Sequence, residues 1–178
     1  ADGIAALREK GRAAVADTLK RHLAATQDTI ALPRYWRFTD SLPRNAQAKI
    51  AAADFQKAFT VAQTSPVWSK TSSDDETNTE TFIGRVPLDL VYFGGHFATF
   101  PLVPGVVELQ WVRNLIAPHP WSKQRVIRIE NLKYQQFIRP HDEVSVELKY
   151  DEGKNKLSFK INNGEHPCAS GRIVFEAV

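Results

Sequence analysis

The sequence predicts an α+β protein in which a curved antiparallel sheet wraps around one long central helix, preceded by a small N-terminal α/β segment. The helix is indicated by residues 104–116, which are apolar on nearly every side. A helix of that kind must be buried nearly all round, so other elements have to enclose it. The sheet is indicated by residues 143–150, whose strict alternation of apolar and polar side chains marks a half-buried strand. Turns at 151–153 and 162–164 then return the chain strand by strand.

The pattern of polar and apolar residues divides the chain into three parts. Residues 4–24 have apolar side chains four apart on one face, which predicts an amphipathic helix, and residues 32–38 predict a short aromatic strand. Residues 63–79 are rich in Ser, Thr and Asp, which is typical of a linker. We therefore expect an N-terminal segment over 1–62, a linker over 63–79 and a sheet-and-helix domain over 80–178.

The remaining strands follow from runs of β-branched and aromatic residues. Those expected in the larger domain are 81–88, 124–132, 134–139, 143–150, 156–161 and a last one that ends at 176. Trp68 is unusual in a linker, and we expect it to pin that segment to the surface of a domain.

Composition limits the kind of protein. With 178 residues, 43% of them hydrophobic, the chain can bury a core of ordinary size. No apolar run reaches the roughly 18 residues that a membrane span needs, and no signal peptide opens the chain, so we expect no membrane span and a cytoplasmic location. The single cysteine, Cys168, excludes an internal disulfide and suits a reducing compartment. No His, Cys or acidic residues have metal-ligand spacing, so we expect no metal and no other cofactor.

The net charge of +3 is unevenly distributed. Residues 1–62 hold 10 Lys and Arg against 6 Asp and Glu, whereas residues 63–178 hold 13 against 14. No basic stripe is interleaved with aromatic residues, so we expect no binding of nucleic acid. The basic surplus fits a solvated face, and it also fits contact with an acidic carrier protein.

A histidine stands on a turn that begins with two glycines, before the central helix. His96 follows Gly94-Gly95 and precedes Phe97, and Pro104-Gly105 then opens the helix. Histidine suits a general base, because its ordinary pKa lies near the operating pH. The start of the helix suits an oxyanion, because its first N–H groups are unpaired and lie at the positive end of the helix dipole. His96 and Gly105 are therefore candidate catalytic positions, whereas we expect a structural role for the other four histidines.

Gly-His-Phe at 95–97, Pro-Leu-Val-Pro-Gly-Val at 101–106 and the helix that follows resemble the hotdog-fold 3-hydroxyacyl-ACP dehydratases of fatty acid synthesis. The pattern is most similar to the branch that acts in aryl polyene and related pigment pathways. The resemblance spans about 80–178 and includes 137–142, where His141 replaces the glycine of the family's Pro-Gly-Asp turn. It implies a hotdog fold and dehydration of 3-hydroxyacyl thioesters to 2-enoyl thioesters. The substrate would be bound to acyl carrier protein or coenzyme A through a phosphopantetheine arm.

The resemblance also implies the roles of individual residues. His96 carries the family's catalytic histidine, and the backbone N–H of Gly105 polarises the thioester carbonyl. The substrate-binding positions are Phe97, Pro104 and Val106. Enzymes of this kind are usually homodimers in which each site takes the histidine from one subunit and the carboxylate from the helix of the other. A homodimer would also cover an exposed strand edge.

The family's catalytic Asp or Glu lies six residues after the proline of Pro-Gly, and this count falls on Gln110. An amide can hold a hydroxyl or a water but cannot donate a proton and leave a stable anion. Glu108 lies about 200° away round the helix and is expected to reach solvent or a partner subunit. Four interpretations stay open: a slow dehydratase driven by His96, a hotdog thioesterase in which Gln110 orients water, a domain that binds acyl thioesters without turnover, and a glutamine introduced to trap substrate.

The N-terminal segment carries a second resemblance. Residues 42–50, Leu-Pro-Arg-Asn-Ala-Gln-Ala-Lys-Ile, are similar to the motif that closes the small C-terminal subdomain of acyl-CoA synthetases and other adenylate-forming enzymes. The resemblance covers about residues 5–60 and places the motif's adenylate-contacting lysine on Lys49, with Ala48 where glycine is usual. Adenylation needs a phosphate-cradling loop, and the chain has no Gly-rich loop. We therefore expect the remnant of a fused synthetase, in which Lys49 is idle and residues 1–62 add nothing to catalysis.

Overall fold

The computed structural model describes residues 2–176, which form two compact units. The N-terminal unit comprises Ala1–Ser65, Pro87–Leu102 and Arg139–His141. The sheet unit comprises Pro66–Val86, Val103–Ile138 and Asp142–Val178. The N-terminal unit therefore differs from the expected 1–62 segment chiefly because it includes the loop that carries His96.

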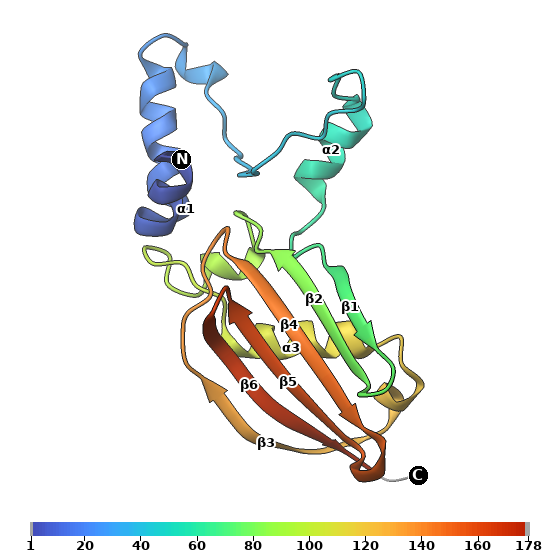
Figure 1. The fold of residues 1–178 in the computed structure, drawn as a ribbon. Helices are drawn as coiled ribbons and strands as arrows, with labels where there is room; N and C mark the ends of the chain where they lie inside the picture. Colours follow the sequence, from blue (N-terminus) through green and yellow to red (C-terminus); the bar gives the residue numbers. More distant parts are fainter. Residues whose placement is uncertain (1, 177–178) are drawn as a thin grey trace. The chain divides into compact units, whose positions relative to one another are not determined.

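The sheet unit is built on an antiparallel sheet of six strands in the order β1-β2-β4-β5-β6-β3. The strands are β1 (Ser69–Asp74), β2 (Thr79–Arg85), β3 (Val126–Tyr134), β4 (Glu143–Asp151), β5 (Lys156–Asn163) and β6 (His166–Phe175). The helices are α3 (Gly105–Ile116) and two short 3-10 turns, η3 (Pro120–Lys123) and η4 (Glu152–Lys154). The strands curve past α3, which lies across one face of the sheet (Figure 1). This is the α+β arrangement that the sequence predicts.

The core of the sheet unit lies between α3 and the central strands. In β4, Val144, Val146 and Leu148 are buried and the residues between them are more exposed, so the alternation in the sequence marks one buried face. Val146 pairs with Ile161 of β5, which is also buried. On α3, Trp111 is 1% exposed. Burying each large apolar side chain stabilises a fold by about 1.5–3 kcal/mol, so helix and sheet stabilise each other.

Within the sheet unit, the structure differs from the predicted strands chiefly at two points. Residues 69–74 of the expected linker form the edge strand β1, whose side chains are all exposed; its polar composition therefore looks like that of a linker. Residues 126–134 form the single strand β3, where the sequence predicts two strands over 124–139. The pairing of β3 with β6 shifts between Glu130 and Lys133, which is where the apolar pattern breaks.

The segment before β1 is held by Trp68, as its position in a polar stretch predicts. Its ring meets that of Trp111 edge-on, with ring centroids 5.8 Å apart and planes at 70°. Aromatic pairs of this geometry contribute about 0.5–1.5 kcal/mol beyond the area that they bury. The contact fastens the start of the sheet to the central helix.

The N-terminal unit contains the helices α1 (Asp2–Ala24), η1 (Thr29–Ala31), α2 (Ala52–Thr60) and η2 (Val91–Gly94). Residues 32–38 form no strand, since no neighbouring segment among residues 2–65 pairs with them. The predicted α/β segment is therefore helical within the described part of the chain. Among residues 2–176, no helix is both long and apolar enough to cross a membrane.

Candidate active site

His96 lies in the N-terminal unit, on the turn that follows η2. The backbone N–H of His96 donates to the carbonyl oxygen of Tyr92, 3.1 Å away, which closes the turn. The side chain is half-buried, and its ring centroid lies 4.9 Å from that of Phe97. Within residues 2–176 the imidazole makes no hydrogen bond to another side chain. No such partner therefore competes for the proton that a general base would take up.

The backbone of Phe97 is left-handed, with φ 55°. That conformation costs an L residue roughly 1–2 kcal/mol, and bulky residues rarely adopt it. The carbonyl oxygen of Phe97 accepts from the N–H of Phe100, 2.9 Å away, so the following turn holds it in place. Backbone strain of this kind gathers at functional sites, which supports a role for residues 95–100.

Helix α1 lies against the same segment. The backbone of Gly11 has φ 76° and approaches the carbonyl oxygen of Ala98 so closely that any side chain at this position would collide with it. Arg139 donates to the carbonyl oxygens of Pro101, at 3.0 Å, and of Arg8. Residues of the 1–62 segment therefore contact the loop that carries His96, which argues against the expectation that they add nothing to catalysis.

Helix α3 begins with its first N–H groups free. Pro104 caps it in an extended conformation (φ −63°, ψ 140°) and offers no side-chain acceptor. The carbonyl oxygen of Pro104 accepts from the N–H groups of Val107 (2.8 Å) and Glu108 (3.3 Å). Within residues 2–176, nothing accepts from the N–H of Gly105 or Val106. Two free N–H groups at the positive end of a helix dipole can stabilise an oxyanion.

Tyr134 on β3 covers the start of α3. Its hydroxyl donates to the carbonyl oxygen of Gly105, 2.9 Å away. A Cβ at Gly105 would lie 2.5 Å from the Tyr134 ring, so the ring comes this close only because residue 105 is glycine. The sequence does not single out Tyr134, because nothing in the sequence around a tyrosine at the end of a strand shows which helix its side chain contacts.

Glu108 is buried in the first turns of α3, with 4% of its surface exposed. Its Oε2 atom has no hydrogen-bond partner among residues 2–176, and burial raises the pKa of its carboxyl group to about 8. The side chain lies near Tyr134 and Cys168 in the sheet unit. The expectation that Glu108 reaches solvent or a partner subunit is therefore wrong, because α3 turns this side chain inward. At neutral pH most of this carboxyl group is protonated.

Gln110 is exposed on α3 and lines a groove of about 550 Å³ in the sheet unit. Its amide nitrogen donates to Oδ1 of Asn114, 2.7 Å away, which leaves the amide oxygen to accept another hydrogen bond. Aliphatic side chains form much of the groove, among them Leu109 and Ile129. An apolar groove beside an amide suits an acyl chain whose polar end lies at the amide.

The predicted site residues fall in both units. His96 and Phe97 belong to the N-terminal unit. Positions 104–106 and Gln110 lie on α3 or at its cap, in the sheet unit, so the oxyanion donors and the amide are held on one helix. In the described part of the chain, no three His, Cys, Asp or Glu side chains are grouped so that they could hold a metal ion.

Lys49 lies in an exposed turn of the N-terminal unit, closed by a bridge between Arg44 and Ile50. Oδ1 of Asn45 accepts from the N–H of Lys49, 3.0 Å away. Ala48 has φ 60°, a conformation that favours glycine, which agrees with glycine being usual at this position of the synthetase motif. The idle role of Lys49 stays a prediction.

The fold of the sheet and its central helix is that of the hotdog class. A chain of the dehydratase heterocomplex ApeI:P from Xenorhabdus doucetiae is 22% identical with a TM-score of 0.57, and the match covers 64% of this chain and 99% of that one. An uncharacterised protein from Erwinia carotovora subsp. atroseptica is 31% identical with a TM-score of 0.54, and the match covers 64% of this chain and 98% of that one. No curated protein matches the chain.

Residues 71–172 match the sequence model of the ApeI-like family, described as ApeI dehydratase. Because that is more than half of the sequence, the chain belongs to the ApeI-like family of dehydratases. This confirms the resemblance of the larger domain to the aryl-polyene branch of hotdog dehydratases. The matched range begins after the 1–62 segment, whose resemblance to an adenylate-forming subdomain stays a prediction.

Proposed function

We propose that the chain dehydrates 3-hydroxyacyl thioesters to 2-enoyl thioesters, with the acyl group carried on the phosphopantetheine arm of a carrier protein or of coenzyme A. The observation that carries this proposal is the His96 imidazole, which stands on the Gly-His-Phe turn of a dehydratase family without a hydrogen bond to another side chain among residues 2–176. A base of that kind is what removal of the C2 proton requires.

In this mechanism His96 takes the C2 proton as the electron pair of that C–H bond forms the C2–C3 double bond. The C3–O bond breaks, and the leaving hydroxyl takes a proton to become water. The N–H groups of Gly105 and Val106 stabilise the negative charge on the thioester oxygen. Gln110 holds the hydroxyl through its amide, and because an amide supplies no proton, the imidazolium of His96 returns the one that it took.

The leaving hydroxyl thus lacks a carboxylic acid. A positioned general acid is worth roughly 10²–10⁴-fold in rate, so we expect turnover to be slow compared with a chain that carries Asp or Glu at position 110. The groove beside Gln110 would take the acyl chain, with Val106 in its wall and Phe97 and Pro104 as the other substrate contacts.

We expect the active form to be a homodimer. Strand β3 lies at the edge of the sheet and exposes apolar side chains, among them Ile127, Ile129 and Leu132, each more than a third exposed. An apolar edge strand is a template for pairing with another chain. In the dimer we expect each site to combine His96 of one subunit with Gln110 of the other. The relative from Xenorhabdus doucetiae is a chain of a heterocomplex, so the expected homodimer is checked by measuring the mass of the assembly in solution.

The first experiment replaces the base. His96→Ala should abolish dehydration of a 3-hydroxyacyl-CoA, measured by the absorbance of the enoyl product, while circular dichroism shows an intact fold. His22→Ala, on exposed α1, is the matched control and should keep the wild-type rate. Dehydration that survives His96→Ala would show that this histidine is not the base. Thioester cleavage without dehydration would favour the hotdog thioesterase, and binding without turnover would favour an acyl-thioester-binding domain.

The second experiment restores the acid. Gln110→Glu and Gln110→Asp should raise the dehydration rate by roughly 10²-fold or more, because each restores a general acid at this position. The position is exposed on the groove and therefore accepts a change of side chain. Asn114→Asp is the control, because it adds a carboxylate one turn further along the exposed face of α3 and not at the position of the family's acid. If neither Gln110 variant gains over wild type while both fold and assemble normally, Gln110 is not a disabled acid but a part of another reaction or of a binding pocket.

A further inference from the structure

A second cavity, of about 630 Å³, lies within the N-terminal unit. Helix α1 forms one wall with Ala13 and Ala16, and the chain around Trp36 forms another. A third wall is formed by Gly94 and Ala98, which stand on either side of His96 in the sequence. The cavity therefore borders the loop on which the proposed base stands.

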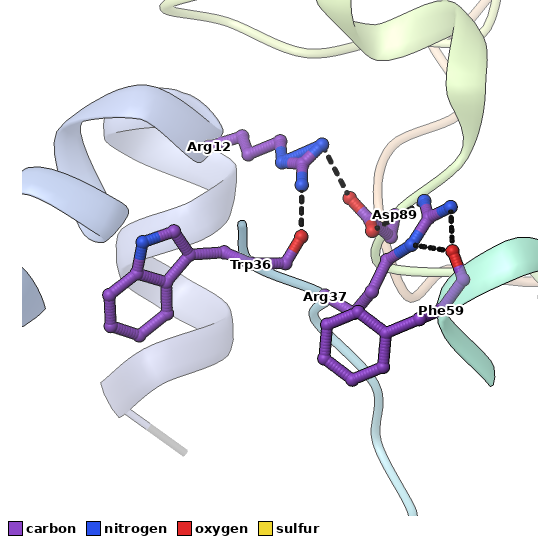
Figure 2. Close-up of polar contacts among 5 residues, drawn as sticks. All are labelled: Arg12, Trp36, Arg37, Phe59 and Asp89. Carbon is purple, nitrogen blue, oxygen red and sulfur yellow. Dashed lines mark hydrogen bonds and ion pairs between the residues drawn. The ribbon is translucent and has the colours of Figure 1, made fainter. Parts of the chain in front are cut away.

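The charged side chains of this cavity are all arginines. Arg12 and Arg37 both pair with Asp89, with Nη1 to carboxylate oxygen distances of 3.2 Å in each case (Figure 2). Asp89 is buried, with 6% of its surface exposed. The other bonds drawn for the two arginines go to the carbonyl oxygens of Trp36 and Phe59, which hold the guanidinium groups without neutralising them.

The charges at this cavity do not balance. Asp89 supplies one negative charge to two guanidinium groups, and Arg34, which also lines the cavity, lies within ion-pair distance of no carboxylate in the described part of the chain. A cluster that served only to join α1 to the neighbouring chain would need no third arginine. The surplus positive charge instead suits an anionic ligand, and the planar fork of arginine matches the oxygens of a phosphate.

The remaining lining is apolar and aromatic. It includes Tyr35, Trp36, Phe59 and Phe93, and Tyr35 is 83% exposed, so its ring is available to a ligand. Cavities of this size that combine aromatic walls with a few fixed polar groups are typical small-molecule sites. The ligand should therefore carry a phosphate at one end and a largely uncharged chain at the other.

We propose that this cavity binds the phosphopantetheine arm of the substrate, with its phosphate at Arg12, Arg34 and Arg37 and its chain along the aromatic walls toward the loop that carries His96. The inference rests on the proposed function, because it assigns the carrier arm of that same acyl thioester. Coenzyme A and a carrier protein share this arm, so the chemistry that is recognised is the same for both sources. The 1–62 segment then contributes to substrate binding rather than to adenylation.

Binding is tested on the intact 178-residue chain by calorimetry, with 4′-phosphopantetheine and pantetheine as the two probes. We expect phosphopantetheine to bind at least tenfold more tightly, and Arg34→Glu to remove this difference. Arg21→Glu is the matched control: it changes an exposed arginine on α1, nine residues from Arg12 and so on the opposite face of the helix. Tyr35→Ala should weaken both probes. Equal affinities for the two probes, or full affinity in Arg34→Glu, would overturn the proposal.

Kinetics separate this proposal from the proposed function. With a 3-hydroxyacyl-CoA, Arg34→Glu should raise KM at least tenfold and leave kcat unchanged, whereas with the N-acetylcysteamine thioester, which has no phosphate, it should change neither. If the chain dehydrates both substrates and Arg34→Glu leaves KM unchanged, the cavity proposal fails and the proposed function stands. If neither substrate reacts but phosphopantetheine binding still depends on Arg34, the proposed function fails and the site stands.

The source of the arm is found by comparing ligands. Binding of a carrier protein that depends on both its phosphopantetheine and Arg34, at lower concentration than coenzyme A, would assign the carrier protein. The reverse order would assign coenzyme A. If coenzyme A binds but 4′-phosphopantetheine does not, the cavity recognises the nucleotide end of the molecule and the proposal is overturned.

Discussion

The buried carboxyl group of Glu108 should make the stability of this protein depend on pH in a way that one substitution removes. Burial raises its pKa from 4.5 to about 8. A pKa that is higher in the folded chain than in the unfolded chain stabilises the fold at low pH. That contribution is complete below about pH 4.5 and is lost as the pH rises to 8. Over the whole window the change is about 5 kcal/mol, since each pH unit of pKa shift corresponds to 1.36 kcal/mol.

Glu108→Gln keeps the size of the side chain and removes its titration. Between pH 5 and pH 7.5, the free energy of unfolding of the wild type should fall by about 3 kcal/mol relative to that of the variant. Urea unfolding at both pH values, followed by circular dichroism at one fixed protein concentration, measures this difference. Comparing the two proteins at each pH also cancels the titration of every group that is common to both.

Glu165→Gln is the control for this experiment. It makes the same chemical change at an exposed position in the turn between β5 and β6, so it should follow the wild type at both pH values. If the difference between wild type and Glu108→Gln stays constant within about 1 kcal/mol from pH 5 to pH 7.5, the carboxyl group is not held protonated. In that case it has water or a hydrogen-bond partner in solution, and the burial argument is refuted.

Four further substitutions test the packing that positions the site. Asp89→Asn should lower the free energy of unfolding by about 1–3 kcal/mol in urea unfolding, because it leaves two partly exposed guanidinium groups without their shared carboxylate; no loss would mean that the pair is solvated. Trp68→Ala should cost about 1–3 kcal/mol in the same assay, since it removes a half-buried ring together with its edge contact to Trp111; a cost under about 0.5 kcal/mol would show that the contact does not form. Gly105→Ala should push the Tyr134 ring from the start of α3 and lower kcat with little effect on KM. Tyr134→Phe removes only the hydroxyl and should lower kcat less.

The sequence predicted the elements whose pattern is local. The expected helix over 104–116 and the observed one over Gly105–Ile116 differ by one residue, because the Pro-Gly start and the continuous apolar run both lie within the helix itself. The alternation over 143–150 likewise identified β4, since one face of that strand is buried and the other is not. The motif around His96 identified the family for the same reason: its glycines, histidine and prolines are close in sequence.

Features that depend on pairing between distant residues could not be predicted. Strand β1 is polar on both faces and is a strand only because β2 lies beside it. Asp89 is separated by more than 50 residues from the arginines that neutralise it, so nothing near it in the sequence shows that it is buried as a partner rather than exposed. Glu108 has apolar neighbours on a helix that is apolar nearly all round, and only the position of the sheet shows which face is inside.

Glu108 and Gln110 are two residues apart on α3, and Glu108, which is mostly protonated at neutral pH, is a candidate for the acid that Gln110 lacks. Glu108 and Gln110 lie about 200° apart round the helix, and the structure places the first inside the fold and the second on the open groove. A substrate hydroxyl held by the amide of Gln110 would have to cross the helix to reach the carboxyl group. The raised pKa of Glu108 then reflects burial alone, and Glu108→Gln should leave the dehydration rate within about twofold of wild type while Gln110→Glu raises it. If Glu108→Gln instead lowers kcat by roughly 10²-fold, the loss typical of a general acid, at a pH where the variant is folded, then the acid lies inside the fold and the substrate enters from the sheet side of α3.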